Sequence, residues 1–431
     1  MTVVNYEYKL QPTPEQEVIL SQWLEVCREV WNGGLEKLKA WYESRACQAN
    51  ACSLTYEYIV SVDAPKPTYT FQCKELTQAR KENPQLKAVH SQVSQQVLYQ
   101  LEKAFISMRE QGHGFPRFKK RGKMRSFLFP QFKSNPIQGS RINLPRIKWV
   151  KMHLSRPIPK GAELKQVRIV KRASSWYAML VLEVDFNLPE PEPHGKAIGI
   201  DVGINHFIAT SEGNFVKNPR YTEKVQGKLK LLQERALRKV KGSKNWHKAQ
   251  QKIAKLYEHV SNARKDFHFK TAHDLCNQAG MLFAEDLNIR ALCRGNLRKP
   301  ILDVGWGQFL DISSWVCQKR GVFFLKVDPK RTSQTCPQCL THTGRKKRNQ
   351  RSHECPQCGY QDDRDVAAAK VIKHRGLTAV GHTVKLPVDS EAVTPSVKQE
   401  ISRAISGVRR YMLKHMAAED VKIPLPTSLL T

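Results

Sequence analysis

Two copies of one tetrapeptide, Cys-Pro-Gln-Cys, constrain the fold of this chain more than any other feature of its sequence. The first copy contains Cys336 and Cys339, the second contains Cys355 and Cys358, and fifteen residues separate the two pairs. Each Cys-x-x-Cys turn can present two sulfurs to one tetrahedral ion, and the loop between them brings the pairs together. Four unrelated cysteines or two redox pairs are the alternatives. The repetition of the tetrapeptide favours a single structural zinc ion.

Acidic residues follow the second cysteine pair within a few positions. Asp362, Asp363 and Asp365 precede an apolar stretch, Val366–Ile372, whose residues predict a helix. A small metal-bound ribbon would therefore deliver carboxylates to the start of that helix. This arrangement is the first indication of function in the sequence.

The charge of the chain indicates the kind of partner it binds. Its 431 residues allow two or three domains, and 71 Lys and Arg against 39 Asp and Glu leave a formal net charge of +32. Such an excess favours a long polyanion, nucleic acid above all, over a small substrate; a membrane surface is the alternative.

No run approaches the roughly 20 apolar residues of a spanning helix, and the first residues lack the pattern of a signal peptide. We therefore expect an intracellular protein, in which the eleven cysteines do not predict disulfides.

The first part of the chain is predicted to contain a strand, then helices, then a β-rich region. Alternating apolar residues predict a strand over Val4–Leu10, and Thr13 with Gln16 forms the capping-box pattern that opens a helix. Helical patterns continue to about Gln111. Strand-like runs follow at residues 142–154, 164–171 and 176–184. These runs predict a β-rich unit of barrel type.

Between the helical and the β-rich regions, residues 114–133 combine basic and aromatic side chains without an acidic residue. Seven residues are Lys or Arg and five are Phe, namely Phe115, Phe118, Phe127, Phe129 and Phe132. Basic side chains contact phosphates and aromatic faces can stack on unpaired bases, whereas a β-hairpin with a solvated charged face is the alternative. We interpret the segment as partly both, with the Phe side chains in the core and the Lys and Arg side chains on nucleic acid.

A different domain begins after a Pro-rich linker. The strand predicted over Ala197–Gly203 carries one carboxylate, Asp201, inside an apolar run, which is costly unless the acid is paired or binds a metal. The strand predicted over Met281–Leu287 likewise carries Glu285 near its end. Between them, residues 220–265 form a helical pattern with fourteen Lys or Arg and three Glu. This excess of positive charge favours a groove that binds a polyanion over an ordinary solvent-exposed face.

Asp201, Glu285 and one Asp at the start of the Val366–Ile372 helix share a setting, because each is an acid at the edge of an apolar element. Carboxylates that converge beside a basic groove are what two-metal hydrolysis of a phosphodiester requires, and such hard oxygen ligands suit magnesium. A structural role for any one acid is the alternative, for example Asp365 as the N-cap of its helix. The residues alone leave open which Asp of the cluster takes part.

Five motifs in the second half of the chain stand in the order seen in TnpB proteins, which are transposon-encoded, RNA-guided DNA nucleases related to type V CRISPR effectors. They are Gly199-Ile200-Asp201-Val202-Gly203, Phe283-Ala284-Glu285-Asp286-Leu287, Gly305-Trp306-Gly307-Gln308-Phe309, Thr332-Ser333-Gln334-Thr335-Cys336 and Asp363-Arg364-Asp365. Two earlier segments, Leu10–Gln16 and Phe115–Lys120, also resemble the family. The resemblance covers nearly everything before the last part of the chain.

The resemblance implies a multidomain fold with α+β and α/β parts. A wedge β-barrel with an inserted helical recognition domain would precede a RuvC (RNase H-like) nuclease domain that carries a zinc-ribbon insert. The implied domains are residues 1–10 for the first wedge strand, 11–112 for the recognition domain, 113–192 for the wedge β-barrel and 193–375 for the nuclease domain, with the zinc ribbon at 329–361. Residues 376–431 would form a largely disordered tail.

The family's motifs carry catalytic roles onto Asp201, Glu285 and Asp365. These acids would hold magnesium, with two ions expected, and the four cysteines would hold zinc. The implied partners are a guide RNA derived from the transposon end and target double-stranded DNA, with no membrane, and a monomer is expected. The implied location is the prokaryotic cytoplasm, in association with the nucleoid.

The implied activity is the cutting of target DNA next to a short flanking motif. A nuclease-impaired, RNA-guided DNA-binding regulator and a transposase accessory protein are the alternatives, and the intact set of three acids favours the enzyme. The chain departs from the family's usual residues at three positions: Ala367 and Val371 stand where Asn is usual, and Leu340 replaces a common Gly.

Overall fold

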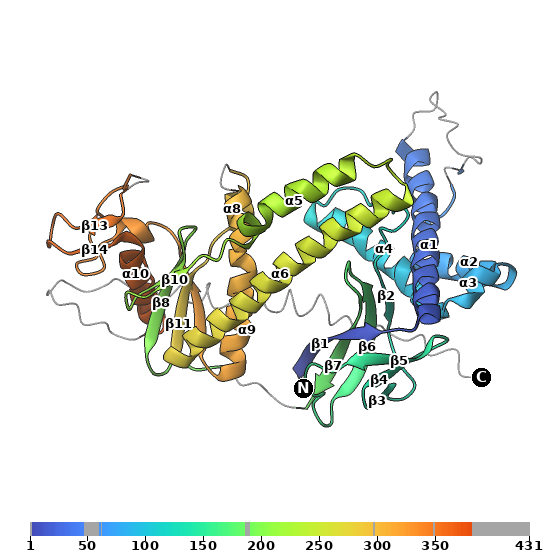
Figure 1. The fold of residues 1–431 in the computed structure, drawn as a ribbon, viewed down its shortest axis with the longest axis horizontal. Coiled ribbons are helices and arrows are strands. Elements are labelled where there is room, and N and C mark those ends of the chain that lie inside the picture. Colours follow the sequence, from blue (N-terminus) through green and yellow to red (C-terminus); the bar gives the residue numbers. More distant parts are fainter. Residues whose placement is uncertain are drawn as a thin grey trace. The chain divides into compact units, whose positions relative to one another are not determined.

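The computed structural model of the chain describes residues 2–46, 60–61, 63–185, 190–295, 298–347 and 350–381. The chain folds as two compact units, and Figure 1 shows their elements. The first unit contains Met1–Leu188 and Leu232–Glu258, and the second contains Pro189–Leu231 and His259–Thr431. Most of the predicted tail, residues 382–431, lies outside the described residues.

The first unit joins helices to an antiparallel sheet. Its helices are α1 (Pro14–Ala46), α2 (Tyr69–Glu82), α3 (Pro84–Ala88) and α4 (Ser91–Gln111). Its strands are β1 (Thr2–Gln11), β2 (Ser126–Phe129), β3 (Ile137–Gln138), β4 (Arg141–Leu144), β5 (Lys148–His153), β6 (Glu163–Lys171) and β7 (Trp176–Val184). They form one sheet in the order β2-β6-β7-β1-β5-β4-β3. The N-terminal strand β1 therefore lies in the middle of the sheet, between β7 and β5.

The start of α1 follows from the side chains predicted to cap it. The backbone N–H of Gln16 donates to Thr13 Oγ1 at 3.3 Å, and the N–H of Thr13 donates to Gln16 Oε1 at 3.1 Å. This reciprocal pair satisfies backbone donors that the first turn of a helix leaves free, so the predicted capping box is confirmed. The amide of Gln16 also donates to the carbonyl of Trp149 at 2.9 Å, which ties the start of the helix to β5.

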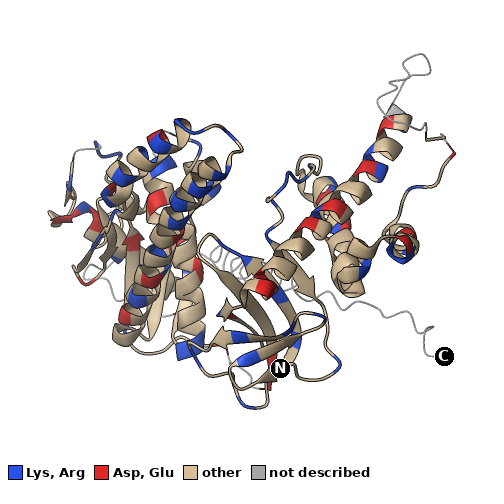
Figure 2. Ribbon diagram, turned by 45° about the vertical axis from the view of Figure 1, so that its right-hand side comes forward, with Lys and Arg blue, Asp and Glu red and all other residues tan. Residues whose placement is uncertain are grey.

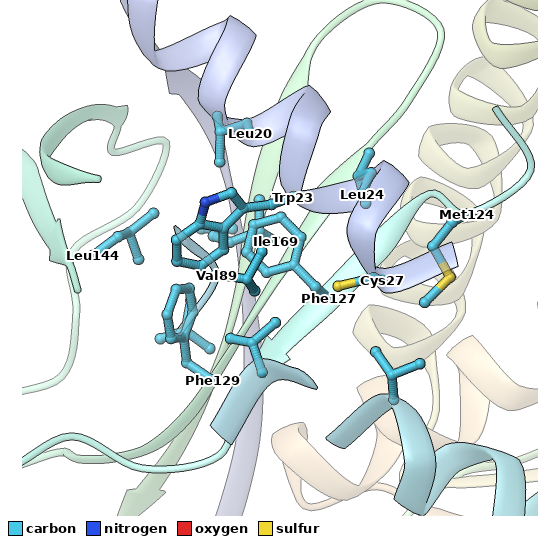
Figure 3. Packing of buried hydrophobic residues seen from close by; sticks show 14 of the residues in the cluster. Leu20, Trp23, Leu24, Cys27, Val89, Met124, Phe127, Phe129, Leu144 and Ile169 are labelled. Carbon is cyan, nitrogen blue, oxygen red and sulfur yellow. The ribbon is translucent and has the colours of Figure 1, made fainter. Parts of the chain in front are cut away.

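One continuous core holds the helices and the sheet of the first unit together. Figure 3 shows Trp23 of α1 packed against Phe127 and Phe129 of β2, with ring centroids 5.5 and 6.0 Å from its own. Val89, which precedes α4, and Leu20 of α1 line the same cluster. Truncating a buried Trp of this kind costs about 3–5 kcal/mol. The predicted helical and β-rich regions thus share their hydrophobic core.

Two predictions for the first unit are wrong in detail. Residues 142–154 form two strands, because the chain turns where the N–H of Ile147 donates to the carbonyl of Leu144 at 3.0 Å. The Phe side chains of residues 114–133 are not all in the core. Phe115 and Phe118 are 40 % and 47 % exposed, because residues 112–125 lie outside any strand or helix.

The second unit is built on a mixed five-stranded sheet. Its strands are β8 (Ala197–Val202), β9 (His206–Thr210), β10 (Phe215–Lys217), β11 (Met281–Glu285) and β12 (Phe323–Val327), in the order β10-β9-β8-β11-β12. The strands β8, β11 and β12 run parallel, and β9 is antiparallel to both β8 and β10. The further elements are α7 (Ile289–Leu292), α8 (Arg298–Val304), α9 (Trp306–Arg320), the 3-10 helix η1 (Thr332–Gln334), β13 (Ser352–Glu354), β14 (Gln361–Asp363) and α10 (Arg364–Ala379).

Two long helices, α5 (Tyr221–Leu237) and α6 (Lys244–Gln278), connect β10 to β11. The loop between them contains Gly242, where the helical pattern of the sequence breaks, and the predicted pair of helices is confirmed. The central stretch of the pair, Leu232–Glu258, belongs to the first unit. There the carboxylate of Glu258 accepts hydrogen bonds from the backbone N–H and the hydroxyl of Ser174, at 2.9 and 2.7 Å.

Different helices cover the two faces of the five-stranded sheet (Figure 1). Ile200 of β8 shares a core with residues of α6 and α9 on one face. Phe283 of β11 shares a core with Ile372 of α10 on the other. Because side chains alternate along a strand, Asp201 faces the α10 side. The helix predicted over Val366–Ile372 is longer than expected and enters the predicted tail.

Two glycines allow α10 to lie at close range against the sheet. A Cβ atom added at Gly199 would come 2.1 Å from the carbonyl oxygen of Ala369, and one added at Gly376 would come 2.2 Å from the ring of Phe283. Both distances are far below normal contact, so the helix would have to move to admit even an alanine. Gly199 lies two residues before Asp201, so this packing determines where α10 starts relative to that acid.

We expect Gly199→Ala to destabilise the second unit by about 2 kcal/mol or more, because the backbone of α10 rather than a flexible side chain stands in the way. Chemical denaturation would measure the loss of unfolding free energy. Gly227 is the matched control, since a Cβ there would meet nothing within 4 Å. Gly227→Ala should stabilise α5 by up to about 1 kcal/mol. Equal stability of Gly199→Ala and the natural protein would contradict the close packing.

Candidate metal centres and the acidic site

The four predicted cysteines come together in the ribbon that precedes α10. Their sulfur atoms all lie within 4.8 Å of one another. Cys336 and Cys358 are 3.6 Å apart at Sγ, and Cys339 and Cys355 are 3.5 Å apart. Four sulfurs at about 2.3 Å from one tetrahedral zinc ion would be separated by slightly more, about 3.8 Å. The cluster therefore fits a zinc ribbon, as the sequence predicts.

Both cysteine pairs end in the same tight turn. The N–H of Leu340 donates to the carbonyl of Cys336 at 3.0 Å, and the N–H of Gly359 donates to the carbonyl of Cys355 at 3.0 Å. Residue 340 has a φ of +59° and residue 359 a φ of +72°, so both adopt the left-handed conformation. That conformation is free for Gly and strained for Leu. The departure from the family's usual residue at Leu340 thus places strain in the first turn.

We expect Leu340→Gly to leave the ribbon at least as stable as before and to raise its stability by up to about 1 kcal/mol, because the relieved strain exceeds the added chain entropy. Zinc retention during titration with a chelator would measure the effect. Gly359→Leu is the matched change in the other turn, and it should weaken retention by about 1–2 kcal/mol. Weaker zinc retention in Leu340→Gly would show that the Leu side chain stabilises the turn in another way.

The structure brings the three predicted acids to one end of the five-stranded sheet. Ala284 pairs with Ile200 across the parallel strands β11 and β8, and Glu285 and Asp201 are the next residues on these strands. Asp365 is the second residue of α10, which packs on the same face. In open sheets with parallel strands, ligands bind beyond the carboxyl ends of the strands, which is where these acids lie.

The charges of the three acids influence one another. Burial, and then the charges of Glu285 and Asp365, raise the pKa of Asp201 well above its usual range. Burial also raises the pKa of Glu285 and of Asp365. A bound cation would offset this cost, and carboxylate oxygens suit magnesium. Among the described residues, the four cysteines are the one group whose ligand atoms lie close together, all within 4.8 Å of one another, and the three acids do not form such a group.

Without a bound cation, we expect Asp201→Asn to raise the melting temperature at neutral pH. A carboxyl with a raised pKa in the folded state binds its proton more tightly there, so the stability of the metal-free protein falls as the pH rises from the ordinary carboxyl range through the raised pKa. In Asp201→Asn the side chain is a neutral amide, so this loss of stability with rising pH does not occur. Thermal unfolding in a chelating buffer would measure the effect.

The difference should shrink at acidic pH, where both side chains are neutral. Added magnesium should stabilise the natural protein and not the variant. A lower melting temperature for Asp201→Asn in the chelating buffer at neutral pH would contradict the electrostatic account.

The two neighbouring acids of the cluster have structural partners. Asp363 is the N-cap of α10, because its Oδ1 accepts from the N–H of Asp365 at 2.8 Å and of Val366 at 3.3 Å. Asp362 binds the ammonium of Lys370 at 2.6 Å and accepts a hydrogen bond from the hydroxyl of Tyr360. The N-cap role that the sequence left open for Asp365 thus belongs to Asp363. The cap does not use the carboxylate of Asp365, whose Oδ2 lies 4.0 Å from the guanidinium of Arg351.

Thr332 contacts the acidic site, although no role was predicted for it from the sequence. Its hydroxyl donates to Oε1 of Glu285, and Thr332 is buried in η1. This hydrogen bond orients the carboxylate and lowers its pKa against the opposite effect of burial. The only signal in the sequence was its place in the Thr332–Cys336 motif.

Ala367 and Val371, which stand where Asn is usual in the family, are both buried in α10.

Basic residues follow the exposed surface of α5 and α6. Figure 2 shows Lys and Arg at many positions along both helices. Lys228, Lys230 and Lys248 are exposed, and none of them forms an ion pair with a residue that the structure describes. Unpaired cations on a protein of this charge are suited to phosphate contacts.

Residues 112–125 form a second basic surface, fastened to α1. Asn32 exchanges two hydrogen bonds with the backbone of Lys119, at 2.8 and 3.0 Å, and the indole of Trp31 donates to the carbonyl of Arg117. The ammonium of Lys119 lies 3.6 Å from the Trp31 ring centroid and is half-buried. The ammonium of Lys119 is thus held on Trp31 within the first unit, and the expected contact of the Lys and Arg side chains with nucleic acid stays a prediction. The other basic side chains of residues 112–125 are exposed.

Three family profiles match the chain. Residues 177–295 match OrfB_IS605, described as a probable transposase; residues 306–372 match a Cas12f1-like TNB domain; and residues 1–47 match a helix-turn-helix domain. Over residues 2–46 the structure has the strand β1 and the single helix α1, without a helix-turn-helix.

Two curated relatives resemble the chain over most of its length. A protein of Streptomyces pristinaespiralis with the provisional name RNA-guided DNA endonuclease is 30% identical over 422 residues, which cover 94% of this chain and 98% of that protein. InsQ of Escherichia coli (strain K12), with the same provisional name, is 29% identical over 398 residues, which cover 88% and 92%. These matches put the chain in the class of OrfB proteins of transposons. More narrowly, the chain belongs to the TnpB family, so the resemblance found in its sequence is confirmed.

Solved structures are similar over most of the chain at low scores. A Cas12f1–sgRNA–target DNA complex has 15% identity and a TM-score of 0.32, and covers 86% of this chain and 99% of that chain. The mini-RNA-guided endonuclease CRISPR-Cas_phi3 has 10% identity and a TM-score of 0.35, and covers 90% and 94%. TM-scores this low do not establish a shared fold. In the parts of the chain that the structure describes, no helix is both long and apolar enough to cross a membrane.

Proposed function

We propose that this protein is an RNA-guided DNA endonuclease that binds a guide RNA and cuts matching double-stranded DNA next to a short flanking motif. The observation that carries the proposal is the arrangement of Asp201, Glu285 and Asp365 at one end of the second unit's sheet. It occurs in a TnpB-family chain whose relatives are named for that activity. Base pairing with the guide would select the target, as in other RNA-guided nucleases.

The three carboxylates are proposed to hold two magnesium ions. Bound there, magnesium would activate water and neutralise charge on the leaving oxygen of a phosphodiester. The chain itself supplies the positions of the ligands. Glu285 is oriented by the Thr332 hydroxyl, and Asp365 is held at the start of α10 by the Asp363 cap. The acids are half-buried or buried, so their charges act on one another more strongly than in bulk water.

The remaining assignments belong to the same proposal. The antiparallel sheet of the first unit would be the wedge β-barrel, the helices α1 to α4 the recognition domain, and the sheet of the second unit the RuvC-like nuclease domain with its zinc-ribbon insert, at the boundaries expected from the sequence. The ribbon would hold zinc for structural purposes. A protein with these partners would act on DNA at the prokaryotic nucleoid.

We expect Asp201→Ala, Glu285→Ala and Asp365→Ala each to slow magnesium-dependent cleavage of a guide-matched DNA by more than about 100-fold, because each removes several kcal/mol of charge stabilisation from the transition state. Binding of guide RNA and DNA should persist, since it relies on Lys, Arg and base pairing. Single-turnover cleavage and filter binding would measure both effects.

Asp363→Asn is the control for this series, because its amide oxygen can still accept from the N–H groups that Asp363 caps. It should retain cleavage. Loss of cleavage in Asp363→Asn but not in Asp365→Ala would mean that the catalytic assignment is wrong by two residues. A natural protein that binds a matched target and does not cut it with magnesium present would favour the DNA-binding regulator.

We expect replacement of Lys228, Lys230 and Lys248 by Glu to flatten the dependence of nucleic-acid affinity on salt. Each lost phosphate contact removes about 0.7–0.9 from the slope of log affinity against log salt concentration. Titrations at several salt concentrations would measure the slope. Lys270→Glu is the control, on the same helix as Lys248, because Lys270 is already paired with Asp266 at 2.8 Å. An unchanged slope in the triple variant would show that these side chains are only solvated.

A further inference from the structure

An exposed pair of aromatic rings lies beside the acidic site without a part in the core. His206 begins β9 and Phe215 begins β10, and their ring centroids are 4.6 Å apart. His206 is exposed, and Phe215 is 40 % exposed. Neither ring belongs to the described hydrophobic clusters of the second unit.

The register of the sheet puts Phe215 on the face that carries the acids. Asp201 of β8 is paired with Ala209 of β9, and Ala209 is paired with Phe215 of β10. Paired residues on adjacent strands project from the same face, so these three residues form one row across the sheet. Because the residue in the middle of the row is a small, buried alanine, it does not stand between the acid and the ring.

An irregularity in the sheet turns His206 toward the same face. The register between β9 and β10 shifts, so that Val216 pairs with Ile208 but Lys217 pairs with His206. The extra residue, Phe207, packs in the core with Ile208 on the opposite face, against Phe309 at 4.9 Å. In a regular strand His206 would share the face of Ile208. The bulge instead places it against Phe215.

The register sets the separation of this pair from the acids. Phe215 lies two strands from Asp201, roughly 10 Å, because neighbouring strands are about 4.8 Å apart. Burial raises the pKa of Asp365, and His206 is among the groups whose charge lowers it. Lys217, two residues after Phe215, is exposed on the same face of β10. The surface beside the acids therefore combines two exposed rings with a cation, the combination that binds a base and its phosphate in single-stranded nucleic acid.

We propose that His206 and Phe215 form a stacking platform for one unpaired base of the DNA strand being cut, and that this contact positions the phosphate of that strand at the acidic site. The proposal rests on the proposed function, because it requires that the acids act on DNA. An unpaired base is favoured over a duplex, since in a duplex the neighbouring base pairs cover both faces of a base and leave none for a protein ring. The platform is a positioning device and takes no part in the chemistry.

The test combines a protein change with a DNA change. Guide-matched targets with one abasic nucleotide at successive positions near the cut are cleaved by the natural protein and by Phe215→Ala, each loaded with guide RNA. With intact DNA, we expect Phe215→Ala to cut about ten-fold more slowly and at scattered positions, as the loss of one base–aromatic stack predicts. At one position, an abasic nucleotide should slow cleavage by the natural protein by a similar factor. The same abasic nucleotide should not slow Phe215→Ala any further, because the stack is already lost. If the protein change and the DNA change slow cleavage additively at every position, the proposal is overturned.

Two protein variants sharpen this test. Phe215→Tyr keeps a flat ring and should restore rate and cut position, whereas Phe215→Leu keeps the apolar volume and should not. Trp315→Ala is the matched control, because Trp315 is also 40 % exposed but lies on α9, whose buried residues pack on the opposite face of the sheet. It should cut at the natural rate and position. Equal rescue by Phe215→Leu would leave only a packing role and would overturn the platform.

A second measurement does not depend on cleavage. In the Asp201→Ala protein, target DNA with 5-iododeoxyuridine near the cut should form a photochemical cross-link to Phe215 or His206, identified by mass spectrometry. Cross-links only outside β9 and β10 would overturn the platform. Failure of the proposed function would be seen differently, as undiminished cleavage by Asp201→Ala or as no cleavage by the natural protein while the cross-link still forms.

Discussion

The close contact between α10 and the five-stranded sheet is the constraint on which the acidic site depends. Gly199 and Gly376 remove the side chains that would hold the helix away from β8 and β11. The helix begins directly after the cysteine ribbon, so the ribbon and the sheet together determine where Asp365 lies. A displacement of the helix by even one side-chain layer would separate this acid from Asp201 and Glu285, and charges act on one another over only a few ångströms.

The stability of the second unit and its proposed chemistry oppose each other at this site. Burial and mutual repulsion raise the pKa of Asp201, and a fold selected for stability alone would not keep such a group. The surrounding structure compensates locally. Thr332 donates to Glu285, Asp363 caps α10, and Lys370 pairs with Asp362. Asp362 and Asp363 have structural partners, whereas the hydrogen bond from Thr332 only orients Glu285, which the proposed function assigns to magnesium together with Asp201 and Asp365.

Local patterns in the sequence predicted many of the elements. The capping box at Thr13 and Gln16, the break at Gly242 and the strands around Asp201 and Glu285 depend on neighbours within a few residues, so they can be recognised in the sequence. The exposure of Phe115 and Phe118, the burial of Lys119 on Trp31 and the turn at Ile147 could not be predicted in this way. Each depends on which distant segment lies alongside.

By itself, the sequence determined the composition of the site: four cysteines in two identical turns, three acids at the edges of apolar elements, and a strong excess of positive charge. Only the tertiary structure decided which acids are capped, that Leu340 adopts a left-handed turn, and that a bulge turns His206 toward Phe215 beside the acids. The reason is physical. Residue type and spacing determine what a side chain can bind, whereas its partners are set by strand register and helix packing, which join residues far apart in the chain.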